Sequence, residues 1–178
     1  MSILVAYATR YGATRQIAGR IAERLRATGL EVDVQSVEAI GDLTGYEAII
    51  LGSAVFYGSW MKEAVKFAQH NRAMLSRRAV WLFSSGPLGT DVTDVHGRDV
   101  REAAVPRQIA ELTSAIKPRD HRVFFRALNR ARLRFPDSLV ARLPAFPGVE
   151  GDFPDWADVE EWAQSIAHEL TPARIGAH

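Results

Sequence analysis

Near its start the sequence reads Ile3-Leu4-Val5-Ala6-Tyr7-Ala8-Thr9-Arg10-Tyr11-Gly12-Ala13-Thr14, and this stretch decides the fold. Residues 3–8 are apolar or aromatic throughout, as in a strand that is buried on both faces. Residues 9–14 form a polar loop. Residues 13–28 then carry apolar side chains three and four positions apart, until Gly29 ends the pattern. A buried strand, a polar loop and an amphipathic helix in this order predict the first unit of a parallel α/β sheet.

The rest of the chain repeats this alternation of strands and helices. Pro106 marks either the start of a helix or a kink in it, and Asp155 is the expected N-cap of the last helix. The pattern predicts a doubly wound α/β domain, with five parallel strands and helices on both faces of the sheet. The further strands are expected at residues 32–37, 48–52, 79–83 and 123–125, and the further helices at residues 60–75, 100–116 and 155–170.

Length and composition are those of an ordinary folded domain. The 178 residues are 47% hydrophobic and 24% charged, so we expect a single domain over residues 1–178. The chain has no cysteine, which excludes disulfides, thiolate nucleophiles and cysteine-ligated metals. It lacks both an apolar run of membrane-spanning length and a secretory leader, and we therefore expect it in the cytoplasm.

The net charge of +1 hides one strongly basic segment. Residues 117–142 hold eight Lys or Arg against two Asp, which gives this segment a charge of +6. Such a segment could contact an anionic substrate, the anionic inner face of a membrane or an acidic protein, or it could be an ordinary solvated surface. A basic segment alone does not indicate nucleic-acid binding, which we do not expect.

Ligands of doubly wound sheets bind beyond the carboxyl ends of the strands, which singles out three loops: residues 9–14, 53–60 and 84–97. In the first loop, Thr9 and Thr14 offer hydroxyls, and the backbone at Gly12 can approach a ligand in front of a helix start. The loop has neither the Gly-Lys-Ser/Thr of a Walker loop nor the three-glycine spacing of dinucleotide folds. It predicts a site for a mononucleotide phosphate, and an ordinary turn capped by threonine is the alternative.

The same stretch resembles the phosphate loop of the flavodoxin family. That pattern of an apolar strand, an aromatic residue, hydroxyls, a small residue and a helix alanine is met at Val5, Tyr7, Thr9, Gly12, Thr14, Ala18 and Ile21. Ala6 departs from the pattern within the strand, where a larger apolar residue is usual. The resemblance implies a sheet of order 2-1-3-4-5, an FMN cofactor, and phosphate binding by residues 9–14.

The second and third loops suit a flat ring system. Residues 53–60 contain three aromatic side chains, of which Tyr57 and Trp60 are candidates for stacking on a flavin, although Trp60 could instead pack into the core. The glycines within residues 85–89 can present backbone groups to ring heteroatoms. The expected cofactor-binding residues are Thr9, Arg10, Tyr11, Gly12, Ala13, Thr14, Ser53, Ala54, Val55, Phe56, Tyr57, Gly58, Ser85, Gly86, Pro87, Leu88 and Gly89.

Further motifs resemble the branch of this family that includes the menaquinone-dependent protoporphyrinogen IX dehydrogenases. They lie at residues 52–58, 83–87 and 151–156, and the resemblance covers essentially the whole chain. Branch members often have glycine after the aromatic residue of the fifth strand, where this chain has Arg126 after Phe125. The resemblance implies an FMN-dependent oxidoreductase that passes electrons through the flavin to a quinone or a protein acceptor.

The segment between the fifth strand and the last helix is longer than a minimal domain needs. Apolar residues and arginines are interleaved over about residues 127–150. The resemblance assigns this segment to the insertion of long-chain flavodoxins, which in the dehydrogenase branch lies near the flavin. There it would help to engage an apolar substrate or the membrane, whereas a solvated surface helix is the plainer interpretation.

We expect no catalytic side chain, because a bound flavin would carry the redox chemistry. The five histidines show no metal-ligand spacing, and we expect no metal. One alternative is a flavodoxin that carries electrons between proteins, although such carriers are strongly acidic and this chain is nearly neutral. The other is a flavin-free scaffold or a binder of a related deazaflavin, which Arg10 and Arg126 suggest.

Overall fold

The computed structural model describes residues 1–88, 105–126 and 155–171. The predicted insertion at residues 127–150 and Gly89 lie outside the described residues. The elements follow one another as β1 (Ser2–Ala8), α1 (Ala13–Arg26), β2 (Glu31–Ser36), β3 (Ala48–Phe56), β4 (Ser59–Trp60), α2 (Lys62–His70), α3 (Arg72–Leu75), β5 (Ala79–Leu88), α5 (Ile109–Ile116), β6 (Asp120–Arg126) and α7 (Trp156–Leu170).

The long strands form a parallel sheet in the order β2-β1-β3-β5-β6, which is the predicted 2-1-3-4-5 order of the five expected strands. The structure adds the short strand β4, which the sequence analysis did not predict and which pairs antiparallel with β3. The register places Ala8 opposite Ser53, and Ser53 opposite Ser84. The three predicted loops therefore begin at one level, along the carboxyl edge of the sheet.

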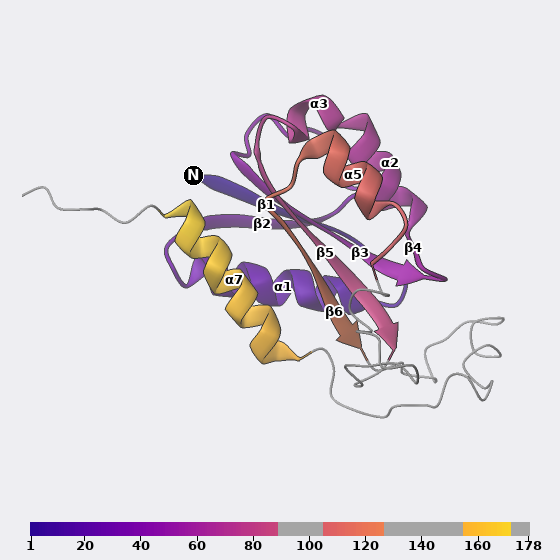
Figure 1. Cartoon of the computed structure of the whole chain (residues 1–178). Helices are drawn as coiled ribbons and strands as arrows, with labels where there is room; N and C mark the ends of the chain where they lie inside the picture. Colours follow the sequence, from indigo (N-terminus) through magenta and orange to yellow (C-terminus); the bar gives the residue numbers. More distant parts are fainter. Residues whose placement is uncertain (89–104, 127–154, 172–178) are drawn as a thin grey trace, which may run out of the picture.

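Helices cover both faces of the sheet (Figure 1). Helices α1 and α7 pack side by side on one face, and α2, α3 and α5 lie on the other. Neighbouring residues of β1 alternate between the two cores: Ile3 and Val5 face α1 and α7, while Leu4 and Ala6 face the opposite layer. All four are fully buried, which explains why this strand is an uninterrupted apolar run.

A cluster of aromatic rings joins the sheet to α7. Phe83, Phe124 and Trp162 lie with their ring centroids 5.5 to 6.2 Å apart, in tilted or edge-to-face arrangements. The ring of Phe83 lies over its partner in the register, Gly52 of β3. A Cβ atom on Gly52 would stand 2.0 Å from that ring, so only glycine fits there. Gly52 is thus required by core packing, not by backbone conformation.

Two predicted helices differ from the observed ones. The helix expected at residues 60–75 is divided into α2 and α3 at Asn71, whose side-chain amide donates to the carbonyl of Phe67 at 2.9 Å. This side-chain hydrogen bond competes with the continuing helix. The helix expected from residue 100 is described from Ile109 onward, and the Ile109 N–H donates to the carbonyl of Pro106 at 3.0 Å. Pro106 therefore precedes the start of α5.

The expected cap of the last helix is confirmed. Asp155 accepts hydrogen bonds from the backbone N–H groups of Ala157 and Asp158, at 3.0 and 3.3 Å. Helix α7 then buries Val159, Trp162 and Ile166 against the sheet. The carboxylate satisfies two amides at the helix start, which stabilises the helix by about 1 kcal/mol.

We expect Gly52→Ala to lower the free energy of unfolding by about 3 kcal/mol, because the added methyl group meets a fully buried ring that other aromatic rings hold in place. Urea unfolding measures the change. Gly19→Ala in α1 is the control. Outside the helix backbone, no atom of the described residues lies within 4 Å of the new Cβ, so the free energy of unfolding should rise by about 0.5 to 1 kcal/mol. Equal stability of the Gly52→Ala variant and the unmodified protein would contradict the packing argument.

Candidate functional site

The first loop, residues 9–14, is a compact turn at the start of α1. Gly12 is the N-cap of the helix and has φ of +86°, a left-handed conformation that favours glycine. The hydroxyl oxygen of Thr9 accepts a hydrogen bond from the Gly12 N–H at 3.0 Å. A hydroxyl oxygen that accepts a bond still has its own hydrogen to donate, so Thr9 can hold the loop and also bind an anion.

Helix α1 begins behind this loop with a set of backbone amides. The first hydrogen bond of the helix runs from the Gln16 N–H to the Gly12 carbonyl, at 3.2 Å. The N–H groups of residues 13–15 precede it, and helix geometry gives such amides no partner within the helix. Together with the positive end of the helix dipole they favour a negatively charged group in front of α1.

Thr14, in the first turn of α1, carries a buried hydroxyl that lacks a partner. Its side chain is 0% exposed, and its Oγ1 atom has no hydrogen-bond partner among the described residues. Leaving a buried polar atom without a partner costs about 1 to 3 kcal/mol, so native proteins rarely do this. An anion at the start of α1 would supply the missing acceptor, which makes Thr14 the clearest sign of a ligand at this edge.

Arg10 and two aromatic rings join the first loop to the second. The Arg10 guanidinium carbon lies 5.7 Å from the ring centroid of Tyr11 and 5.6 Å from that of Phe56. The two rings meet edge to face with their centroids 6.0 Å apart. These contacts are of cation–π and aromatic type, and they bring together predicted site residues from the loop after β1 and from β3.

The second loop is a β-hairpin, which corrects the expectation that residues 53–60 form an irregular loop. Strand β3 continues to Phe56, and β4 returns antiparallel with Val55 opposite Trp60. Tyr57 and Gly58 form the two-residue turn, with φ of +51° and +71°. Positive φ at both central residues is the type I′ arrangement that matches the strand twist. The turn presents Tyr57 with 68% of its side chain exposed, where a flat ring could stack on it.

Hydrogen bonds from several elements hold this hairpin. The hydroxyl of Ser53 accepts from the Met61 N–H at 3.0 Å and donates to the carbonyl of Ala54. The backbone N–H of Arg107, just before α5, donates to the Gly58 carbonyl at 3.2 Å. Ser53 is 0% exposed and its side chain serves the hairpin, and Ala54 is buried as well.

Trp60 does not stack on the outside of this loop. Its side chain is 3% exposed and packs in the core between the sheet and α2. Its indole N–H donates to Ser84 Oγ at 2.8 Å, and its backbone N–H donates to the side chain of Gln108 at 3.1 Å. Of the two interpretations of Trp60, core packing is the correct one. Its proposed role in stacking was wrong, because the core and Ser84 hold the indole.

The third loop begins later than predicted. Strand β5 continues to Leu88, with a register shift against β6 between Ser85 and Leu88. Ser85 is 4% exposed, and Gly86 has φ of +118° beside the backbone of Val55. This end of β5 therefore lies against the hairpin. Pro87 and Leu88 belong to the strand by their backbone, and Gly89 lies outside the described residues.

His121 lies opposite Leu82 near the start of β6, and its side chain reaches the carboxyl edge at Ser84. The sequence analysis did not single it out. Its Nε2 atom lies 2.8 Å from Ser84 Oγ, the same oxygen that accepts from Trp60. Burial lowers the pKa of His121 from 6.5 to about 4, and the negative charge of Asp120 only partly opposes this shift. The imidazole is therefore neutral at neutral pH. One histidine within a strand carries no sequence signal that could have identified it.

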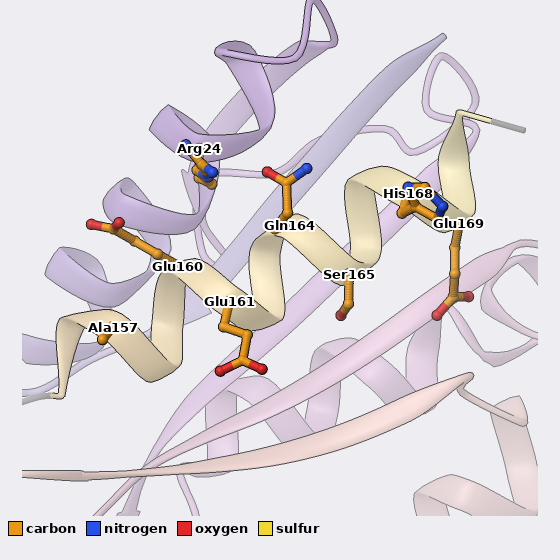
Figure 2. A pocket seen from close by; sticks show the side chains of 8 residues that line it. All are labelled: Arg24, Ala157, Glu160, Glu161, Gln164, Ser165, His168 and Glu169. Atoms are coloured by element: carbon orange, nitrogen blue, oxygen red, sulfur yellow. The ribbon is translucent and has the colours of Figure 1, made fainter. Parts of the chain in front are cut away.

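Several charged residues outside the loops form ion pairs with α7. In the described part of the basic segment, Arg119 pairs with Glu169 at 3.2 Å and Arg122 pairs with Asp158. A shallow groove beside α1 and α7 holds none of the loop residues, and its Glu161 and Glu169 point away from α1 (Figure 2). The groove is lined by Arg24, Ala157, Glu160, Glu161, Gln164, Ser165, His168 and Glu169.

In residues 1–88, 105–126 and 155–171, no group of three or more His, Asp or Glu side chains could hold a metal ion. None of the helices in these ranges combines the length and the apolar composition that a membrane crossing needs.

The chain matches known proteins over most of its length. The family model described as a flavodoxin domain matches residues 4–144. The protoporphyrinogen IX dehydrogenase [quinone] of Escherichia coli K12 is 25% identical over 177 residues, which cover 94% of this chain and 96% of that protein.

Solved structures with the same fold are more distant in sequence. Oxidised flavodoxin 2 from Bacillus cereus superposes with a TM-score of 0.62 at 21% identity, covering 95% of this chain and 99% of that one. A flavodoxin from the domain Archaea gives a TM-score of 0.61 at 16% identity, covering 96% and 99%. These likenesses establish the flavodoxin-like fold.

The neutral state of His121 predicts an acid-sensitive stability. The unfolded chain binds this proton near pH 6.5 and the folded chain only near pH 4, so the unfolded state binds more protons between these values. Stability therefore falls as the pH drops through this window. At pH 4.5 the loss from this residue should be about 2 to 3 kcal/mol, relative to neutral pH.

Urea unfolding at pH 7 and pH 4.5 measures this loss, with His121→Gln as the variant that cannot take up the proton. Subtracting one pH dependence from the other removes the carboxylates that both proteins share. The glutamine variant should lose less stability on acidification than the unmodified protein. The same pH dependence in both proteins would show that His121 is not buried in its neutral form.

Proposed function

The chain belongs to the flavodoxin domain family, and on this premise we propose that it is an FMN-dependent oxidoreductase with its cofactor at the carboxyl edge of the sheet. The observation that carries the proposal is the buried hydroxyl of Thr14, which has no partner among the described residues and stands at the start of α1. A phosphate there would accept its hydrogen bond. The residues present therefore fit the phosphate end of a flavin mononucleotide.

Each part of the first loop has a role in holding the phosphate. Thr9 and Thr14 would donate hydroxyl hydrogens, and the amides at the start of α1 would donate N–H groups. Gly12 gives the loop its left-handed backbone and adds no side chain in front of the amides. Charge-assisted hydrogen bonds of this kind are stronger than neutral ones, so this loop would supply much of the affinity for the cofactor.

The hairpin and the end of β5 would hold the ring system. The exposed Tyr57 at the hairpin turn offers a face for stacking, and the backbone of Gly58, Ser85 and Gly86 offers donors and acceptors. A bound flavin supplies the chemistry, since it can take up and release hydride or single electrons. The residues around it would set its potential through burial and hydrogen bonding, and no protein side chain needs to act as an acid or a base.

For the substrate, we propose a protoporphyrinogen-type compound with a quinone or a protein as electron acceptor. The support is the curated relative named protoporphyrinogen IX dehydrogenase [quinone], which this chain matches over nearly its full length at 25% identity. The basic segment at residues 117–142 would favour an anionic substrate or an anionic membrane surface. Within its described part, Arg119 and Arg122 are paired with α7, so this role would fall to its remaining arginines.

The second candidate is an electron carrier of the flavodoxin type, which the solved structures of the same fold favour. Both candidates bind FMN and differ in whether a small molecule is turned over. The third candidate is a protein that binds a deazaflavin. Arg10 suggests it, because this residue of the phosphate loop carries a positive charge and contacts Tyr11 and Phe56.

Titration with FMN, riboflavin and a deazaflavin, followed by flavin fluorescence and absorbance, tests the cofactor. We expect micromolar or tighter binding of FMN and weaker binding of the other two, because only FMN brings a terminal phosphate to α1. Anaerobic assays of the FMN-loaded protein with protoporphyrinogen and menaquinone then separate an enzyme from a carrier. Protein that stays colourless after reconstitution with FMN would refute the cofactor proposal, and a preference for the deazaflavin would replace it.

Thr14→Val should have opposite effects on binding and on stability. Removing one hydroxyl donor to a charged phosphate costs about 1.5 to 3 kcal/mol, so the affinity for FMN should fall roughly ten- to a hundredfold. Riboflavin lacks the phosphate and should bind as before. The flavin-free variant should be up to about 1 kcal/mol more stable to urea, because a buried hydroxyl without a partner becomes a methyl group.

Gly12→Val is the companion variant for the same loop. Apart from Gly12 and its two chain neighbours, no atom of the described residues lies within 4 Å of a Cβ at this position, so the new side chain is strained by the φ of +86° and not by packing. Gly12→Val should lower the affinity for FMN more than Thr14→Val does, and it should also lower the free energy of unfolding. Wild-type affinity of Thr14→Val for both FMN and riboflavin would show that the phosphate does not bind at this loop.

A further inference from the structure

Three strands meet at a single buried oxygen atom, Ser84 Oγ. This side chain of β5 is 0% exposed and accepts the indole N–H of Trp60 from β4 at 2.8 Å. On its other side, at 2.8 Å, lies Nε2 of His121 from β6. Within the described residues, this chain of hydrogen bonds connects the hairpin to the far edge of the sheet.

The chemistry of the three groups constrains these bonds. An indole N–H can only donate, so Ser84 Oγ is the acceptor for Trp60. The direction of the bond between Ser84 Oγ and His121 Nε2 depends on the tautomer of the imidazole, because a neutral ring nitrogen either accepts or donates. In both tautomers the bond holds the serine side chain between Trp60 and His121. Replacing His121 by a side chain without a polar atom would remove this bond, so the Ser84 side chain could turn away from Trp60.

We propose that His121 is a positioning residue for the flavin ring: through Ser84 it fixes Trp60, and with Trp60 the hairpin that carries Phe56 and Tyr57. This inference rests on the proposed function. Trp60 pairs with Val55 across the hairpin, and Val55 lies two residues before the exposed Tyr57 of the turn. Ser84 directly precedes Ser85 and Gly86. The hydrogen bonds at Ser84 Oγ therefore also fix the position of the hairpin relative to the end of β5.

The neighbouring residue of β6 provides a matched control. Asp120 accepts the indole N–H of Trp162 at 2.7 Å, on the α7 side of the sheet. Trp60 and Trp162 are each 3% exposed, and each donates its indole N–H to a single side-chain oxygen. Losing either bond should therefore have a similar effect on stability. Only the bond of Trp60 is connected to the hairpin.

The test compares His121→Phe, Trp60→Phe and Trp162→Phe with the unmodified full-length protein. Hydrogen exchange of the backbone amides at residues 55–61 reports on the hairpin without any flavin. We expect exchange there to become at least tenfold faster in His121→Phe and Trp60→Phe, and to stay unchanged in Trp162→Phe. In the double variant His121→Phe/Trp60→Phe, hairpin exchange should be no faster than in either single variant, because both changes break the same chain of hydrogen bonds.

Flavin binding provides the second readout. His121→Phe should weaken riboflavin and FMN by the same factor, about five- to tenfold, because the hairpin contacts the ring that both ligands share. This pattern differs from Thr14→Val, which should affect FMN alone. His121→Gln should restore most of the riboflavin affinity, since its amide can again meet Ser84 Oγ. If His121→Phe does not fold, Trp60→Phe carries the comparison with Trp162→Phe.

The outcomes separate the two proposals. If the unmodified protein binds neither FMN nor riboflavin, the proposed function fails and the positioning role falls with it. If it binds both, and His121→Phe changes riboflavin affinity and hairpin exchange no more than Trp162→Phe does, only the positioning role is wrong. Failure of His121→Gln to recover riboflavin affinity would likewise overturn the role of the hydrogen-bonded chain.

Discussion

Burial of the central strands on both faces is the constraint on which the rest of this structure depends. Strands β1, β3 and β5 lie between two helical layers, so their side chains are apolar along most of their length. Polar side chains become possible only where the strands leave the core. The register places this change at one level, with Ala8, Ser53 and Ser84 side by side. The polar groups of these strands therefore lie along the carboxyl edge of the sheet, which is where ligands of such sheets bind.

The hydroxyl groups at this edge divide into two kinds by what they contact. Those of Thr9, Ser53 and Ser84 have protein partners and hold loops or strands in place. The hydroxyl of Thr14 is buried and has none among the described residues. Native proteins rarely leave a buried hydroxyl unsatisfied, and a ligand at the start of α1 would complete this one. The stability that this position loses in the flavin-free protein would be recovered when the phosphate binds.

Strand β6 links the stability of the fold to the geometry of the site. Successive side chains of a strand point to opposite faces, so Asp120 reaches Trp162 of α7 while His121 reaches Ser84 and the hairpin. The first contact belongs to the aromatic core that also requires Gly52. The second contact connects to the hairpin whose turn carries the exposed Tyr57. The solved flavodoxins share this fold at 16% and 21% sequence identity.

The strand order was implied by the resemblance of residues 5–21 to the flavodoxin family, and the structure confirms it. The sequence by itself determined the alternation of buried strands with helices and the two helical layers, because apolar runs and helical spacing are local signals. It also located the Asp155 cap, which depends on neighbours two and three residues away. Tertiary structure alone decided that residues 53–60 form a hairpin, that Trp60 is buried and that His121 joins the site. The burial of Trp60 and the position of His121 beside Ser84 depend on contacts between residues 24 to 48 positions apart, such as Trp60 with Ser84 and Gln108. Local patterns carry no information on such contacts, since the distance between these groups is set only when the strands are aligned in the sheet.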